Sequence, residues 1–194
     1  MLISDPVTGK NDSLMKRKWM KLFSMYDVDN TGVLKVSDFQ NLLDRLSSRK
    51  GWTRDSAKYV NLMDKLYHRW IHIHGEVKDS LGHKASEATV TLDEWLLYHE
   101  KVLGQRTYRE QVVEIEDLIF NALDSDASGG IELKEWQFLF QVYGIPVIYA
   151  EDTFAKIDLN HDGCLTKPEL LPLIEQFYCS QELDAPGNFI FGPL

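Results

Sequence analysis

Asp158-Leu-Asn-His-Asp-Gly-Cys-Leu-Thr-Lys-Pro-Glu169 is a twelve-residue stretch in which oxygen-bearing side chains recur at fixed positions. Positions 1, 3, 5, 9 and 12 carry Asp158, Asn160, Asp162, Thr166 and Glu169. Position 6 is Gly163, where a sharp turn needs a positive φ that glycine adopts at little cost. We expect the carbonyl of Cys164, at position 7, to turn inward. This spacing lets a short loop wrap around a hard divalent cation, which takes roughly six to eight oxygen ligands.

The same pattern occurs at two other places in the chain. Residues 124–135 offer Asp124, Asp126, Ser128, the carbonyl of Gly130, Glu132 and Glu135. Residues 27–38 offer Asp27, Asp29, Thr31, the carbonyl of Val33 and Asp38. All three stretches have glycine at position 6, an aliphatic residue at position 8 and a phenylalanine four residues before position 1. Such loops are typical of EF-hands, and the shared apolar frame favours three Ca²⁺ sites over three unrelated turns.

A fourth loop is degenerate. With Val90 at position 8 and Glu94 at position 12, counting back places His83, Ala85, Glu87 and Ala88 at positions 1, 3, 5 and 6. Two ligands and the turn glycine are lost, so we expect no Ca²⁺ there. The loop still predicts a short β-bridge at position 8, which pairs Leu34 with Val90 as Ile131 pairs with Leu165.

The fold predicted from these repeats is all-α, with two packed EF-hand pairs in one globule and short β-bridges between paired loops. We expect an N-terminal pair at 1–104, a C-terminal pair at 105–180 and an apolar tail at 181–194 that packs on the body. Apolar periodicity and capping residues predict helices over 13–26, 54–74, 92–102, 107–123, 133–143, 147–157 and 167–178. Thr53 is expected to cap the second of these. We expect residues 1–12 to form a loose end.

Composition narrows the function classes. The net charge is −9 at pH 7, which argues against nucleic acid, and ten acids lie at ligand positions of the three loops. The sequence has no apolar run of about 18 residues, so we expect no membrane span, and we expect residues 1–6 not to belong to a signal peptide, because they lack an apolar run. Cys164 and Cys179 are too few for a disulfide framework, so we expect both to be reduced. These features predict a cytoplasmic monomer.

The chain resembles the sarcoplasmic calcium-binding proteins and the related calexcitins. The resemblance rests on Gly51-Trp52, Glu94-Trp95, Tyr143-Gly-Ile-Pro146 and the tail Ala185-Pro-Gly-Asn-Phe-Ile-Phe-Gly192. It implies a compact helical protein that binds Ca²⁺ and often Mg²⁺ in invertebrate muscle or neurons. Relatives of calexcitin are also linked to GTP binding and potassium-channel modulation, but Gly9-Lys10 lacks the rest of a phosphate-binding loop, so no nucleotide site is supported.

The three ion sites should differ. The loop of residues 27–38, which we call loop I, has Asp38 at position 12 and Lys35 at position 9. The side chain of aspartate is one methylene shorter than that of glutamate. A shorter arm favours a single oxygen contact and a six-coordinate shell, which suits Mg²⁺. We therefore expect Ca²⁺ at the loops of residues 124–135 and 158–169, and weaker Ca²⁺ or resting Mg²⁺ at loop I.

The sequence is compatible with three functions. A Ca²⁺ buffer or closed signalling protein is favoured over a sensor that opens for an unidentified target protein, because all five methionines lie in the first half and the tail could fill a groove. A coelenterazine-binding photoprotein is the third alternative, since photoproteins share a defective second EF-hand. His68 and His72 have a zinc-compatible spacing but no evident third ligand. No catalytic acid–base set is visible, so we do not expect an enzyme.

Overall fold

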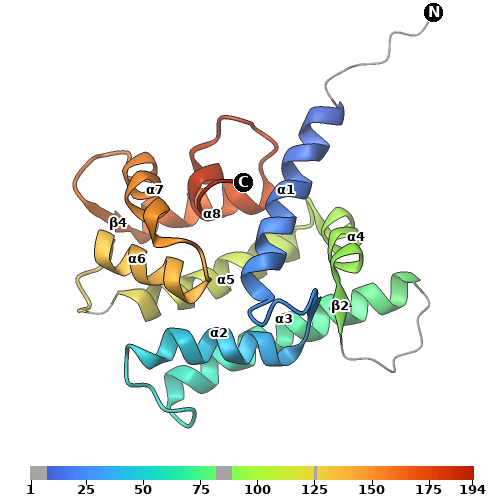
Figure 1. The fold of residues 1–194 in the computed structure, drawn as a ribbon, viewed down its shortest axis with the longest axis horizontal. Coiled ribbons are helices and arrows are strands. Elements are labelled where there is room, and N and C mark those ends of the chain that lie inside the picture. Colours follow the sequence, from blue (N-terminus) through green and yellow to red (C-terminus); the bar gives the residue numbers. More distant parts are fainter. Residues whose placement is uncertain (1–7, 82–88, 125) are drawn as a thin grey trace, which may run out of the picture.

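The computed structural model describes residues 8–81, 89–124 and 126–194, and its elements are arranged as Figure 1 shows. The helices of these ranges are α1 (Thr8–Tyr26), α2 (Val36–Ser48), α3 (Ala57–Leu81), α4 (Leu92–Val102), α5 (Arg106–Leu123), α6 (Leu133–Val142), α7 (Ala150–Ile157) and α8 (Lys167–Cys179), with two short 3₁₀ turns, η1 (Val147–Tyr149) and η2 (Pro186–Phe189). The all-α prediction is confirmed.

Both predicted loop pairings are present in the predicted register. Strand β1 (Val33–Leu34) pairs antiparallel with β2 (Val90–Thr91), and Leu34 faces Val90. Strand β3 (Gly130–Glu132) pairs antiparallel with β4 (Cys164–Thr166), and Ile131 faces Leu165. The four position-8 side chains have no exposed surface, so an apolar contact couples the two loops of each pair.

Helix boundaries of α1, α3 and α7 were predicted wrongly. Helix α1 begins at Thr8, so residues 8–12 are helical, and α7 begins at Ala150 rather than 147, after the 3₁₀ turn η1. The rest of the expected loose end lies outside the described residues. Helix α3 begins at Ala57 rather than 54, because Ser56 and not Thr53 stands at its start, where the Ser56 Oγ accepts from the Tyr59 N–H at 3.4 Å. The apolar face of α3 also continues through the buried Val77, which carries the helix to Leu81 instead of 74.

The two halves of the chain pack directly on each other. Helix α3 lies against α5, α2 against α6 and α1 against α8. The fully buried Lys18 of α1 donates through Nζ to the carbonyl oxygens of Gln176, at 3.3 Å, and Ser180, at 2.8 Å. Burial lowers the pKa of Lys18 to about 8. A cation at this end of α8 meets the negative end of the helix dipole, so the contact joins the first helix to the last.

The tail folds back against α7 and α8. Ile190 and Phe191 are each 1% exposed, and η2 lies on α8 and α7. The approach is close at Gly187, where an added Cβ would lie 2.3 Å from the carbonyl oxygen of Leu173. Only glycine permits this contact, in which the Gly187 N–H also donates to Gln176 Oε1 at 3.0 Å.

Candidate metal centres

Loops I (27–38), III (124–135) and IV (158–169) share one hydrogen-bonded frame. In each loop the position-6 N–H donates to the position-1 carboxylate: Gly32 to Asp27 at 2.9 Å, Gly129 to Asp124 at 3.1 Å and Gly163 to Asp158 at 2.9 Å. The position-9 N–H donates to the position-12 carboxylate: Lys35 to Asp38 at 2.7 Å, Glu132 to Glu135 at 3.2 Å and Thr166 to Glu169 at 2.9 Å. The frame therefore holds the first and last acids by one oxygen each.

Loop I brings three carboxylates together around a buried oxygen. Oxygens of Asp27, Asp29 and Asp38 lie within 4.8 Å of one another. Asp38 has no exposed surface, and its Oδ1 has no hydrogen-bond partner among the described residues. Burial, and then the charges of Asp29 and Asp27, raise the pKa of Asp38. A buried carboxylate oxygen without a partner is costly, and a divalent cation would satisfy it, so this loop fits a metal ion.

We expect Asp38→Glu to raise the preference of loop I for Ca²⁺ over Mg²⁺ by about tenfold, because a longer arm can offer both oxygens to the larger ion. Calorimetric titration of Ca²⁺ with and without millimolar Mg²⁺ measures this ratio. The reciprocal control is Glu135→Asp, which shortens the same arm in loop III and should lower the ratio there. An unchanged ratio in both variants would contradict the role given to the arm length.

Loop III gathers its acids in the same way. Oxygens of Asp124, Asp126 and Glu135 lie within 4.8 Å of one another, and Glu135 is buried. Gly130 at position 7 lies close to the paired strand, where an added Cβ would lie 2.0 Å from Cys164 Sγ and the cysteine side chain would have to move. Its carbonyl, a predicted ligand, accepts from Ser128 Oγ at 3.0 Å. These contacts bring together five of the predicted ligand residues of loop III.

Loop IV is arranged differently at its centre. The Asn160 amide donates through Nδ2 to Asp162 Oδ2 at 3.0 Å and to Glu169 Oε1 at 2.6 Å. The Asn160 amide N–H group therefore lies between the two carboxylates, at the place where a cation would bind their oxygens. Asp158 Oδ1 is buried and, among the described residues, has no partner. For Asn160 to act as the predicted ligand, its amide must turn so that Oδ1 faces the ion.

The ligand pattern did not predict the backbone conformation at position 4 of the loops. Asn30, Ala127 and His161 occupy it, and their φ angles are 54°, 59° and 59°. This left-handed conformation is common for asparagine but costs free energy for alanine, whose Cβ crowds the backbone. The ring of His161 is exposed, in agreement with the expectation that this position points outward.

The degenerate loop keeps the second of the two shared hydrogen bonds, the one between positions 9 and 12. The Thr91 N–H at position 9 donates to Glu94 Oε2 at 2.7 Å, as its counterparts do in the other loops. Trp95, at the next position, has no exposed surface and donates through Nε1 to the Trp19 carbonyl at 2.8 Å. The residues predicted at positions 1 to 6, His83 to Ala88, lie outside the described residues.

Comparison with known proteins places this geometry among EF-hand proteins. The family model described as EF hand matches residues 115–140 and 150–171, which contain loops III and IV. The sarcoplasmic calcium-binding protein alpha-B and -A chains of Penaeus sp. are 27% identical over 179 residues, which cover 88% of this chain and 91% of theirs. Calerythrin of Saccharopolyspora erythraea is 22% identical over 174 residues, or 87% of this chain and 91% of its own.

Solved structures agree on the fold. The amphioxus sarcoplasmic calcium-binding protein superposes with a TM-score of 0.71 at 18% identity, over 93% of this chain and 97% of its own. The coelenterazine-binding protein of Renilla muelleri, in its Ca-loaded apo form, superposes with a TM-score of 0.69 at 19% identity, over 97% of this chain and 100% of its own. Among the described residues, no helix is long and apolar enough to cross a membrane.

Proposed function

This chain belongs to the sarcoplasmic calcium-binding protein family of EF-hand calcium-binding proteins, and we propose that it acts as a cytosolic Ca²⁺ buffer with three working sites. The ligands would come from the predicted positions of loops I, III and IV. Two unpartnered buried carboxylate oxygens, Asp38 Oδ1 and Asp158 Oδ1, support ion binding in loops I and IV, and the clustered acids support it in loop III. Loop I would carry Mg²⁺ in resting cells.

One observation carries the choice of buffer over sensor. Ile190 and Phe191 of the tail reach into the same apolar interior as Trp136, Leu139 and Ile174 from α6 and α8. In a sensor, this space between the helices of an EF-hand pair opens to receive a target helix. Here the chain's own tail occupies it, and the ring of Phe191 lies 4.9 Å from that of Phe177 in an edge-on contact. A target would first have to displace the tail.

The methionines support the same choice. Sensor surfaces are rich in exposed methionine, because its flexible side chain adapts to different partners. Met15 and Met25 are each 2% exposed and belong to the packed face of α1, and Met63 packs against the core. Met20 is 48% exposed, so among the described residues the chain presents one strongly exposed methionine and no methionine-rich surface.

A photoprotein role receives less support. The structural likeness to a coelenterazine-binding protein concerns the fold. The two apolar cavities beside α6, one lined by Leu42 and Leu139 and the other by Trp136 and Phe191, have volumes of about 10 Å³ each. A drug-sized ligand such as coelenterazine needs a site of roughly 300 Å³ or more.

The proposal predicts three bound Ca²⁺ ions without exposure of apolar surface. Calorimetric titration gives the stoichiometry, and fluorescence of an apolar-surface dye, measured before and after Ca²⁺ in the same samples, should change less than about twofold. A chain shortened after Leu183 serves as the positive control, because it uncovers the space that Ile190 and Phe191 fill. A several-fold rise in dye fluorescence for the full chain would favour a sensor, and fewer than three ions would reject the assigned sites.

A further inference from the structure

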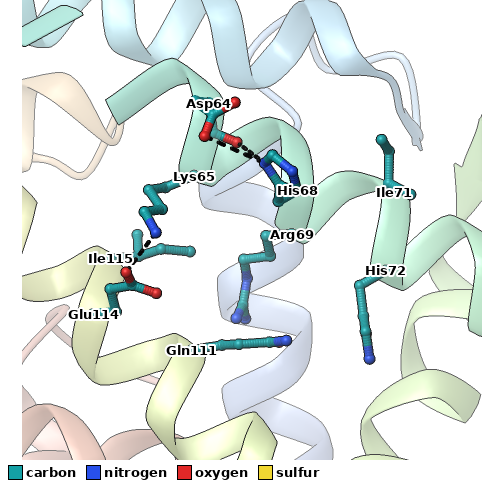
Figure 2. A pocket seen from close by; sticks show the side chains of 9 residues that line it. All are labelled: Asp64, Lys65, His68, Arg69, Ile71, His72, Gln111, Glu114 and Ile115. Carbon is teal, nitrogen blue, oxygen red and sulfur yellow. Dashed lines mark hydrogen bonds and ion pairs between the residues drawn. The ribbon is translucent and has the colours of Figure 1, made fainter. Parts of the chain in front are cut away.

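A cleft between α3 and α5 lies apart from the four loops. Its cavity volume is about 610 Å³, and we call it the α3–α5 cleft. Lys65, Arg69 and His72 line it from α3, and Gln111, Glu114 and Ile115 from α5. Figure 2 shows the side chains of Arg69 and Gln111 extending from the two helices toward the same space. A volume of this size is in the range of small-molecule sites.

The guanidinium of Arg69 has no hydrogen-bond partner among the described residues. The residue is 4% exposed, and none of its three guanidinium nitrogens has a hydrogen-bond partner among the described residues. The guanidinium carbon lies 5.7 Å from the centre of the Tyr108 ring, a contact that satisfies no N–H group. Since arginine stays protonated in proteins, a buried guanidinium without a counter-ion is unfavourable, and an anion at this position would relieve it.

The acids near Arg69 form no hydrogen bond with it among the described residues. Glu114 is engaged by Lys65, whose Nζ lies 2.6 Å from Glu114 Oε1. Asp64 lies 3.5 Å from the ring of His68. Glu116 is buried on the same helix as Gln111 and accepts from the Tyr178 hydroxyl. Burial raises the pKa of Glu116 to about 7, although the charge of Arg69 favours its ionised form. A second unpartnered group, Gln111 Oε1, is also present, and rotation of its amide would turn two N–H donors toward a ligand.

We propose that the α3–α5 cleft binds a small organic monocarboxylate, held by the Arg69 guanidinium and the Gln111 amide. A planar carboxylate matches the paired donors of a guanidinium. The acids Asp64 and Glu114 at the cleft balance Lys65 and Arg69, so a ligand with several negative charges is disfavoured. Ile71, Ile115 and the imidazole of His72 offer apolar or aromatic contacts for the body of the ligand.

Benzoate is a suitable probe, with benzamide as its uncharged isostere and sulfate as a multiply charged anion. In amide NMR spectra of the Ca²⁺-loaded full chain, benzoate should cause saturable shifts in α3 and α5, and benzamide and sulfate should bind at least about tenfold more weakly. Arg69→Met should weaken benzoate binding by about tenfold or more. Arg106→Met, which removes a cation of α5 that does not line the cleft and is paired with Glu110 at 2.7 Å, should change it by less than about threefold.

Calcium stoichiometry and circular dichroism show whether each variant is folded. If Arg69→Met does not fold, Gln111→Leu replaces it, and its expected loss is about threefold to tenfold. The proposal is overturned if benzoate gives no saturable shifts up to about 20 mM, if benzamide binds equally well, or if both Arg69→Met and Gln111→Leu bind benzoate like the unmodified chain.

Discussion

Glu135→Gln lowers the Ca²⁺ affinity of loop III by more than about 100-fold, because even residues that only orient metal ligands contribute about 10- to 100-fold. The substitution keeps the size of a side chain that is 8% exposed, and it removes the charge from the cluster with Asp124 and Asp126. Calorimetry should show two strongly bound ions instead of three. The affinity of loop IV should also fall, because β3 and β4 join the two loops.

Glu132→Gln is the matched control for this prediction. Glu132 belongs to the same loop and loses the same charge, but its side chain is exposed, and position 9 often acts through a water molecule. We expect an affinity loss of less than about tenfold for this variant. Equal losses for the two variants would mean that overall loop charge, and not direct contact with Glu135, sets the affinity.

Phe191→Ala lowers the free energy of unfolding by about 3–5 kcal/mol, as truncation of a buried phenylalanine commonly does. Phe191 is 1% exposed, and its ring makes edge-on contacts with Phe177 and Tyr143 at 4.9 and 5.7 Å between centres. Urea denaturation at a fixed free Ca²⁺ concentration measures the loss, because bound ions also stabilise the folded state. The same variant should increase dye binding, since it empties part of the interior that the tail fills.

Phe189→Ala is the same substitution two residues earlier in the tail. Phe189 is 37% exposed, and its ring lies 4.8 Å from Lys156 Nζ, a surface contact worth about 0.5–1 kcal/mol. We expect a loss of about 1 kcal/mol or less. If Phe191→Ala is no more destabilising than this control, the tail is not an integral part of the core, and the closed form that we propose loses its main support.

Local chemistry explains why the sequence predicted so much of the site. A twelve-residue loop needs glycine at the turn and oxygen atoms at fixed positions, and Gly32, Gly129 and Gly163 all adopt positive φ angles as predicted. Position 8 needs only an aliphatic side chain, so the pairing of Leu34 with Val90 could be predicted even though that second loop lacks ligands. Helix ends were predicted less accurately, because Thr53 and Ser56 can both cap a helix and the preference for serine over threonine is small.

Other features depend on contacts between distant residues. The burial of Asp38, the position of the Asn160 amide between Asp162 and Glu169, and the contact of Lys18 with the end of α8 follow from how the helices pack. Arg69 is another case, because in the sequence it is one charge on an amphipathic helix, where a solvated position is the usual outcome. Only the folded structure shows that Arg69 is buried and that its guanidinium nitrogens have no hydrogen-bond partners among the described residues.

The sequence by itself determined the number and type of the loops, their pairing and the all-α fold, because loop geometry and apolar periodicity are properties of a few neighbouring residues. The tertiary structure decided which buried polar groups find partners and where the tail lies. These outcomes depend on residues far apart in the chain, such as Lys18 and Ser180, or Phe191 and Tyr143. Desolvation acts only once such residues are brought together, so packing sets it and no local pattern encodes it.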